Sequence, residues 1–179
     1  MINHYFLNDS GILRSIRQRN YRNAAPKPIC RFAISIFAII LWGELAAWRI
    51  SAQLADGLVP LEAKMAATSQ AHDEARHFYV LHDYLAALGH PPDQLPPRSA
   101  RVLEEVLNAR GLPHKLIGMQ MMVEPMALTL FQSVREQAVC PVLSELLEYF
   151  ERDEARHVAL GAVEIGDGGL AAVHDERVA

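Results

Sequence analysis

Cysteine is scarce in this chain, and its scarcity excludes several kinds of site. The 179 residues contain two cysteines, Cys30 and Cys140, which form no closely spaced pair. A disulfide framework, a cysteine-rich zinc site and a Cys-x-x-Cys redox motif are therefore excluded. Free cysteines in a chain without a recognisable signal peptide indicate a reducing compartment, so we expect a cytoplasmic protein.

A long hydrophobic run is also missing. The most apolar stretch extends from Phe32 to Gly43 and is interrupted by Glu44. Because a helix needs about 20 apolar residues to span a bilayer, we expect a buried helix here and no membrane span. Attachment to one face of a membrane is the alternative.

Neither sign of charge dominates, but the charge is unevenly distributed. The formal net charge is −4, which argues against a dedicated nucleic-acid-binding protein. Residues 1–31 nevertheless contain six arginines and lysines against the single acidic residue Asp9. We predict a basic, poorly ordered arm over residues 1–30, a folded domain over 31–165 and a flexible tail over 166–179.

Strand patterns are nearly absent, and helical periodicity dominates. Apolar spacing, with proline and glycine positions, predicts long helices over about 31–55, 60–89, 115–138 and 141–166. The connection between the second and third helices is long and contains a short helix near 99–109. A long connection lets the chain cross the length of a bundle, whereas short ones join antiparallel neighbours. We therefore predict an all-α fold, a ferritin-like four-helix bundle with one long crossover between helices two and three.

The pentapeptide DEARH occurs at 73–77 and again at 153–157. In each copy the glutamate and the histidine are three residues apart, so they share one face of a helix. Another glutamate precedes each copy at the same distance, Glu44 in the first half and Glu124 in the second. The two halves therefore offer equivalent half-sites, and we predict a two-metal centre held by Glu44, Glu74, His77, Glu124, Glu154 and His157.

The charge of these residues indicates which metals would suit them. Four buried glutamates without compensation would be very costly, and two divalent cations would cancel their charge. Carboxylate and imidazole ligands suit iron or manganese better than metals that prefer thiolate. We expect two iron ions, with manganese as the alternative.

The remaining charged residues of the two DEARH copies are candidates for the surroundings of the metals. A ligating imidazole usually donates its other N–H to a carboxylate or a carbonyl oxygen. Asp73 and Asp153 are therefore expected to hold the histidine of the opposite half-site, and Arg76 and Arg156 to pair with those aspartates. An ordinary solvated charge is the alternative for each.

Two further positions bear on access to the metals. Pro125 follows Glu124 and removes a backbone hydrogen bond to the carbonyl of Met121, so the third helix is expected to kink or bulge there. Gly161 lies four residues after His157, where the first half has Leu81. We interpret Gly161 as a site of close helix packing, with a small pocket as the alternative.

The pattern of Glu44, DEARH at 73–77, Glu124 and DEARH at 153–157 resembles the ferritin-like di-iron carboxylate superfamily. It is most similar to the oxygen-activating branch that includes the hydroxylase subunits of soluble methane and toluene monooxygenases. The resemblance implies that Glu44 and Glu124 are terminal ligands, that Glu74 and Glu154 bridge the metals, and that each histidine binds one iron. The chain departs from relatives in two places, with Leu81 where ribonucleotide reductases have a radical tyrosine and Leu128 where oxygenases have a threonine.

The resemblance implies a di-iron oxidoreductase that uses dioxygen or peroxide to oxidise or hydroxylate a small organic substrate. Such an enzyme needs an external electron donor, and it can form a homo-oligomer. An iron-handling ferroxidase is one alternative. A metal-stabilised structural or partner-binding bundle without turnover is another.

Overall fold

The computed structural model describes residues 28–90, 95, 97–138 and 141–166 of the chain. The predictions of a basic arm and a flexible tail fall almost entirely outside these residues. Within them the protein is all helical and contains no strand. The prediction of an all-α fold is therefore confirmed for the described part of the chain.

The helices follow one another with short breaks. They are α2 (Pro28–Gly57), α3 (Leu61–Ala87), α4 (Pro97–Leu107), α5 (Leu112–Gly118), the π-helix η3 (Met119–Val123), α6 (Glu124–Glu136) and α7 (Pro141–Gly166). Pro60 precedes the first residue of α3, and Gly89 and Gly111 adopt positive φ angles of 77° and 78° in the turns beside α3 and α5. A proline cannot continue a preceding helix and glycine tolerates this backbone conformation, so these residues separate the helices as the sequence predicts.

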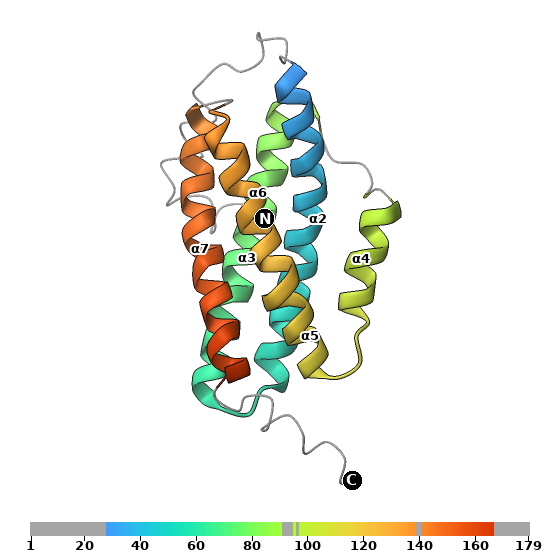
Figure 1. Ribbon diagram of the computed structural model, residues 1–179, viewed down its shortest axis with the longest axis vertical. Helices are drawn as coiled ribbons and strands as arrows, with labels where there is room; N and C mark the ends of the chain where they lie inside the picture. The colour runs from blue at the N-terminus through green and yellow to red at the C-terminus, as the bar shows by residue number, and fades with distance from the viewer. Residues whose placement is uncertain (1–27, 91–94, 96, 139–140, 167–179) are drawn as a thin grey trace, which may run out of the picture.

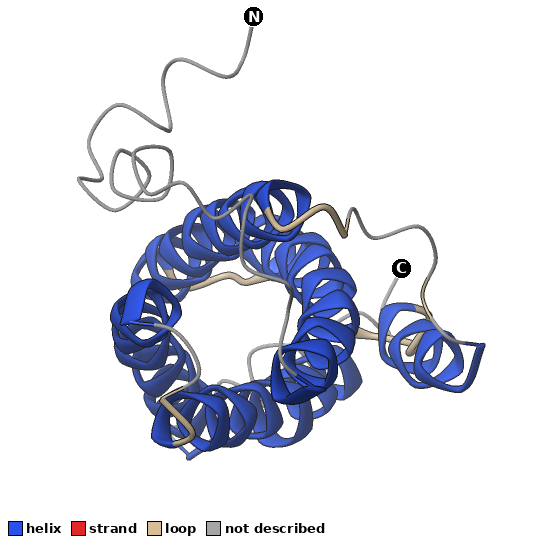
Figure 2. Ribbon diagram, turned by 90° about the horizontal axis from the view of Figure 1, so that it is seen from above, coloured by secondary structure: helices blue, strands red, loops and turns tan. Residues whose placement is uncertain are grey.

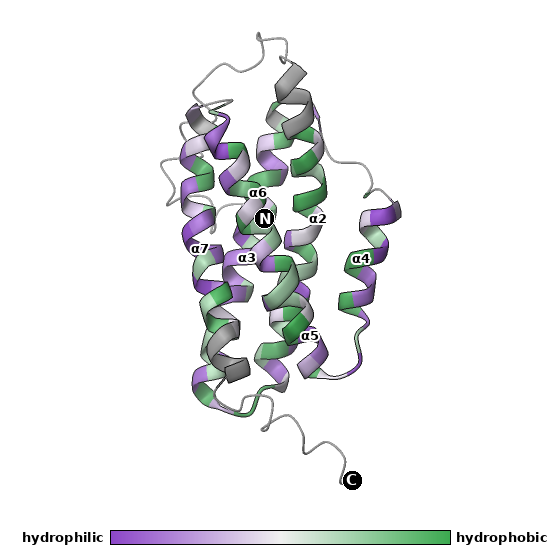
Figure 3. Ribbon diagram, viewed as in Figure 1, coloured by the Kyte–Doolittle hydropathy of each residue, from purple (hydrophilic) through white to green (hydrophobic). Residues whose placement is uncertain are grey.

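The long helical segments lie side by side around a common interior (Figures 1 and 2). Helix α2 packs against α3, and α6 packs against α7. The short helix α4 lies outside this arrangement, beside α2. Figure 3 shows that α2 is largely hydrophobic, whereas α7 carries hydrophilic and hydrophobic residues in alternation.

The hydrophobic core consists of two clusters of buried side chains. The first joins α2, α3, α6 and α7 and includes Phe37, Leu81, Phe131 and Phe150. The second joins α2, α3, α4, α5 and η3 and includes Ile50, Leu54, Leu116 and Met119. Along α2, Glu44 falls between residues of the first cluster and residues of the second, so the core is interrupted at one level by ionisable side chains.

Helix α2 is longer and more apolar than the run ending at Glu44 indicates. The segment Ile34–Gly57 has a mean hydropathy of 1.5 and is long and apolar enough to cross a membrane by length and composition. In its most apolar window, 44% of the residues are buried inside the protein. The core helix of a soluble protein passes the same test, and this helix contains the buried Glu44.

Candidate metal centre

The structure brings all six predicted ligands together in the interior. Glu44 lies on α2, and Glu74 and His77 lie on α3. Glu124 is the first residue of α6, and Glu154 and His157 lie on α7. All six side chains are buried, with at most 3% of any residue exposed. Residues that are far apart in the sequence thus meet at the level between the two hydrophobic clusters.

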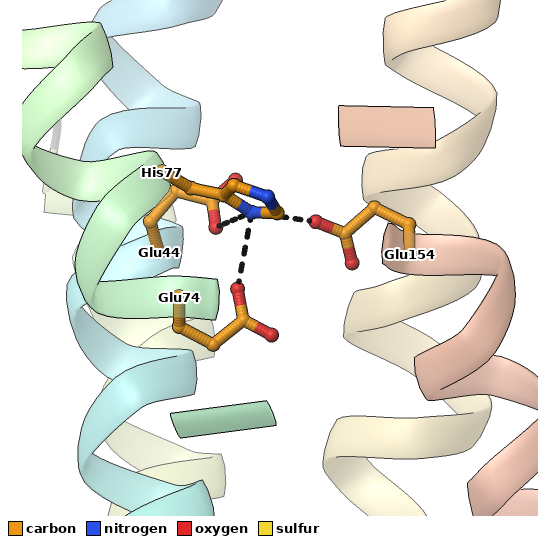
Figure 4. A group of neighbouring side chains, drawn as sticks. All are labelled: Glu44, Glu74, His77 and Glu154. Carbon is orange, nitrogen blue, oxygen red and sulfur yellow. Dashed lines mark hydrogen bonds and ion pairs between the residues drawn. The ribbon is translucent and has the colours of Figure 1, made fainter. Parts of the chain in front are cut away.

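The first half-site is centred on His77. Figure 4 shows its ring directed toward three carboxylates from three helices. The Nδ1 atom of His77 lies 3.3 Å from Glu44 Oε2, 3.4 Å from Glu74 Oε2 and 3.2 Å from Glu154 Oε1. These four residues offer ligand atoms within 4.8 Å of one another, so they could hold a metal ion.

The second half-site is centred on His157 and uses two of the same glutamates. The Nδ1 atom of His157 lies 2.9 Å from Glu74 Oε1, 3.3 Å from Glu154 Oε2 and 3.7 Å from Glu124 Oε2. Glu74, Glu124, Glu154 and His157 form the second group that could hold a metal ion. Because Glu74 and Glu154 belong to both groups, two ions bound here would be neighbours.

The other nitrogen of each imidazole faces an aspartate from the opposite DEARH copy. His77 Nε2 lies 3.2 Å from Asp153 Oδ2, and His157 Nε2 lies 3.5 Å from Asp73 Oδ2. An N–H at Nε2 leaves the lone pair at Nδ1 directed toward the glutamates. The position of the aspartates favours this tautomer in both histidines once a metal ion binds at Nδ1.

Two arginines connect the aspartates to each other. Arg76 donates to Asp73 Oδ1 at 3.1 Å and to Asp153 Oδ2 at 2.5 Å. Arg156 donates to Asp73 Oδ2 at 3.3 Å and also to Asp153 Oδ1. The arginines are partly exposed while the aspartates are buried, so this network lies between the cluster and the solvent.

Several buried oxygen atoms of the cluster lack a hydrogen-bond donor. Both carboxylate oxygens of Glu74 and Oε1 of Glu154 accept no hydrogen bond from any described residue. A buried carboxylate oxygen without a partner is strongly unfavourable, and a coordinated cation removes that cost. Oxygen and imidazole nitrogen are donors that suit iron and manganese. The residues present therefore fit a pair of divalent metal ions.

Without a bound cation, the net charge of the cluster depends on which of its carboxyl and imidazole groups carry protons. Burial raises the pKa of the Glu44 and Glu124 carboxyl groups well above the usual range. Burial and the charge of Glu154 oppose ionisation of Glu74, but the adjacent imidazoles of His157 and His77 bring its pKa below the usual value. The surrounding carboxylates raise the pKa of both histidines despite their burial. Divalent cations would displace these protons, which is the usual behaviour of a metal site.

Two buried glutamines beside the cluster were missed by the sequence analysis. Gln70 donates from Nε2 to Glu124 Oε1 at 2.6 Å, and Gln120 donates from Nε2 to Gln70 Oε1 at 2.6 Å. Both glutamines are 2% exposed. Gln70 lies one helical turn before Glu74, and Gln120 one turn before Glu124, which is the spacing that shares a helix face and was available in the sequence.

The predicted irregularity beside Pro125 is confirmed. The residues directly before Glu124 form the π-helix η3, and the Glu124 N–H bonds to the Met119 carbonyl. Pro125 has no N–H to bond to the preceding turn, and a π-turn absorbs the resulting mismatch. The interpretation of Gly161 as a packing site is also confirmed, because a Cβ atom there would lie 2.2 Å from Gln120 Cβ.

An apolar cavity borders the cluster. It has a volume of about 270 Å³ and lies between α2, α4, η3 and α6. Its lining is mostly hydrophobic side chains, and Glu44, Glu124 and Glu154 reach its wall. Gly43 contributes space, since a Cβ built there meets no atom within 4 Å. A small apolar molecule in this cavity would contact three of the candidate ligands.

No protein-family model matches the sequence, and neither a curated protein nor a solved structure matches the chain.

Proposed function

We propose that the protein is a ferritin-like di-iron oxidoreductase that uses dioxygen to oxidise or hydroxylate a small apolar organic substrate. The observation on which the proposal rests is an apolar cavity that borders a buried cluster of four glutamates and two histidines. A storage protein needs a path for ions to its metals, whereas an apolar cavity at the ligands favours an organic substrate.

The arrangement of the helices supports the ferritin-like assignment. In Figure 1, α4 lies alongside α2. The colours, which follow the chain, show that α5, η3 and α6 then run in the opposite direction to α4. This path is what a bundle with one long crossover requires between its second and third long helices. The glutamates and histidines of the four long segments face inward at one level, as in di-metal bundles.

In this proposal the six residues bind two iron ions, with manganese as a possible replacement. Glu44 and His77 would hold one ion and Glu124 and His157 the other, while Glu74 and Glu154 would be shared by both. The iron pair, when bound, supplies the redox chemistry by which dioxygen is reduced and the substrate is oxidised. Hydroxylation also consumes an electron pair from outside the protein, so an external electron donor is part of the proposal.

The protein's own residues contribute charge balance, orientation and exclusion of water. Asp73 and Asp153 keep the histidine Nε2 atoms protonated and their Nδ1 atoms available. Hydrophobic side chains of both core clusters close the site above and below, which strengthens electrostatic interactions within it. The cavity lining would hold an apolar substrate beside Glu44, Glu124 and Glu154.

The surroundings of the enzyme are proposals as well. We propose a cytoplasmic location, a small-molecule substrate as the main partner and no binding to nucleic acid. Assembly into a homo-oligomer would be compatible with the exposed hydrophobic side chains Trp48, Met121 and Met122, which are 43%, 56% and 59% exposed.

The proposal is tested by loading the protein with ferrous ion under anaerobic conditions and then admitting air. Oxidation that stops at about two irons per chain, with the change in absorbance of a carboxylate-bridged ferric pair, is expected from the ligand set. Continued oxidation with a soluble mineral would instead show an iron-handling protein and overturn the proposal. An iron-loaded protein that does not react with air would also overturn the proposal and would favour a structural role for the metal.

Substrate oxidation is tested by filling the cavity. Ala127 is partly buried and lines it, so Ala127→Phe should leave iron uptake intact but lower hydroxylation of benzene, with a chemical reductant present, by at least about tenfold. Ala52→Phe on the exposed side of α2 is the matched control. Equal product yields from the two variants would show that this cavity does not receive the substrate.

A further inference from the structure

The two half-sites have matching ligands but differ beside their outer glutamates. An offset of 80 residues relates Glu44 to Glu124 and His77 to His157. The same offset relates Gln70 to Phe150, and Ile40 to Gln120. The second half-site therefore has two amides where the first has an aromatic ring and an aliphatic side chain.

The amide directions in the Gln70–Gln120 pair are determined by Glu124. A carboxylate oxygen that accepts from Gln70 requires the NH₂ group of Gln70 to face Glu124. The carbonyl of Gln70 is then free to accept from Gln120 Nε2, as the distance of 2.6 Å indicates. Glu124 Oε1 is held by this chain of hydrogen bonds, which leaves Oε2 on the side of His157.

The first half-site has no such support. Phe150 stacks on the His77 ring with a centroid distance of 3.9 Å and an interplanar angle of 23°. Among the described residues, Glu44 has a hydrogen bond to His77 and none to an amide. Its carboxylate reaches the wall of the apolar cavity, so its orientation depends on the metal and on His77.

The fold provides a place for the Gln70–Gln120 pair. Gln120 lies in η3, and its Cβ atom occupies the space left by the missing side chain of Gly161 on α7. The first half has the fully buried Leu81 in place of Gly161. The π-turn and the glycine together therefore allow a polar side chain to enter the core beside one glutamate only.

We propose that the Gln70–Gln120 pair is a positioning device that makes the two metal positions unequal, so that the position at Glu124 and His157 binds its ion first and more tightly. This inference rests on the proposed metal centre. A ligand that is already oriented loses less conformational freedom on coordination, and hydrogen bonds from neighbouring residues to metal ligands typically change affinity by about 10- to 100-fold.

The experiment is a titration of the full-length protein with Mn²⁺, in which the free ion is measured by electron paramagnetic resonance. The wild-type protein should bind two ions in two distinguishable steps. Glu124→Ala should remove the tighter step, and Glu44→Ala should remove the weaker one. Gln70→Met keeps the length of the side chain but removes both hydrogen bonds, and it should weaken the tighter step by about 10- to 100-fold while leaving the weaker step nearly unchanged.

Gln132→Met is the matched control, because Gln132 is exposed on α6, and both binding steps should stay as in the wild type. Two equal steps in the wild-type protein, or a Gln70→Met variant that binds like it, would overturn the positioning role while leaving the metal centre intact. Equal weakening of both steps would also overturn it, since a general loss of structure affects both positions. Absence of Mn²⁺ binding to the wild-type protein would instead contradict the proposed centre itself.

Discussion

At the scale of single residues, each candidate ligand histidine depends on the other half of the protein. Asp153 on α7 faces His77 on α3, and Asp73 on α3 faces His157 on α7. The hydrogen bonds from His77, Arg76 and Arg156 hold the pKa of Asp153 well below its usual range despite partial burial, so it remains a charged acceptor. A charged acceptor at Nε2 orients the ring and increases the basicity of Nδ1.

Replacement of either aspartate by asparagine should therefore weaken one metal position. In Asp153→Asn the amide can present either a donor or an acceptor to His77, so the required tautomer is no longer enforced. We expect the ion beside His77 to bind about 10- to 100-fold more weakly. Asp73→Asn should have the corresponding effect on the ion beside His157, and Mn²⁺ titration measures both. Wild-type affinity in both variants would show that the aspartates only pair with the arginines.

At the scale of the helices, two glycines with the same secondary structure have opposite surroundings. Gly161 on α7 faces Gln120 so closely that an added Cβ would lie 2.2 Å from its Cβ atom, whereas an added Cβ at Gly43 on α2 meets nothing within 4 Å. Neither glycine has a positive φ angle, so alanine is compatible with the backbone at both positions. The difference between them is packing alone.

This contrast predicts opposite effects of the same substitution. Gly161→Ala should lower the free energy of unfolding by roughly 1–3 kcal/mol, because the α7 backbone or η3 must shift to relieve the overlap. Gly43→Ala should leave it unchanged or raise it by up to about 1 kcal/mol, the usual gain for alanine over glycine inside a helix. Urea denaturation of the metal-free proteins measures both. A Gly161→Ala variant with the wild-type free energy of unfolding would contradict this prediction and would show that η3 shifts at little energetic cost.

At the scale of the whole molecule, the candidate metal centre is a polar layer between two apolar clusters. On one side of the layer the first cluster holds α2, α3, α6 and α7 together, and on the other side the second cluster holds α2 and α3 against α4, α5 and η3, so helix packing does not require the metal. The layer itself contains buried carboxylate oxygens without donors. Metal ions should therefore stabilise a fold that already exists.

Loading with metal should raise the melting temperature of the protein. An ion at a hundredfold excess over its dissociation constant adds about 2.7 kcal/mol per site, which corresponds to at least about 5 °C for a protein of this size. Calorimetry with Mn²⁺ and then with a chelator measures the rise and its reversal. A melting temperature that does not respond to the ion would contradict the two-metal interpretation, and a metal-free protein without helical circular dichroism would contradict an independently stable scaffold.

Much of the fold and of the site could be predicted from sequence. Helical periodicity with proline and glycine breaks predicted the helices to within a few residues, because these residues act locally on the backbone. The third long helix was predicted as one element over 115–138, yet it begins at Leu112 and includes a π-turn at Met119–Val123. Pro125 indicated an irregularity, but its form depends on how η3 packs against α7.

The residues around the candidate ligands were less accessible to prediction. The two copies of DEARH and the two upstream glutamates predicted the candidate ligands, because helical spacing places the glutamate and the histidine of each copy on one face. Gln70 and Gln120 share those faces, but neutral polar residues at such positions are common, and their hydrogen bonds span 50 and 54 residues. Which amide reaches which carboxylate is decided only when α3, η3 and α6 pack together.

The sequence by itself determined the helical class and the repeated half-site, because both follow from the periodicity of one helix at a time. Only the tertiary structure decided the asymmetry between the halves, including the Gln70–Gln120 pair against Gly161, the stacking of Phe150 on His77 and the apolar cavity at the glutamates. These features depend on the distances between helices and on the volume that facing side chains fill, and no single helix contains that information.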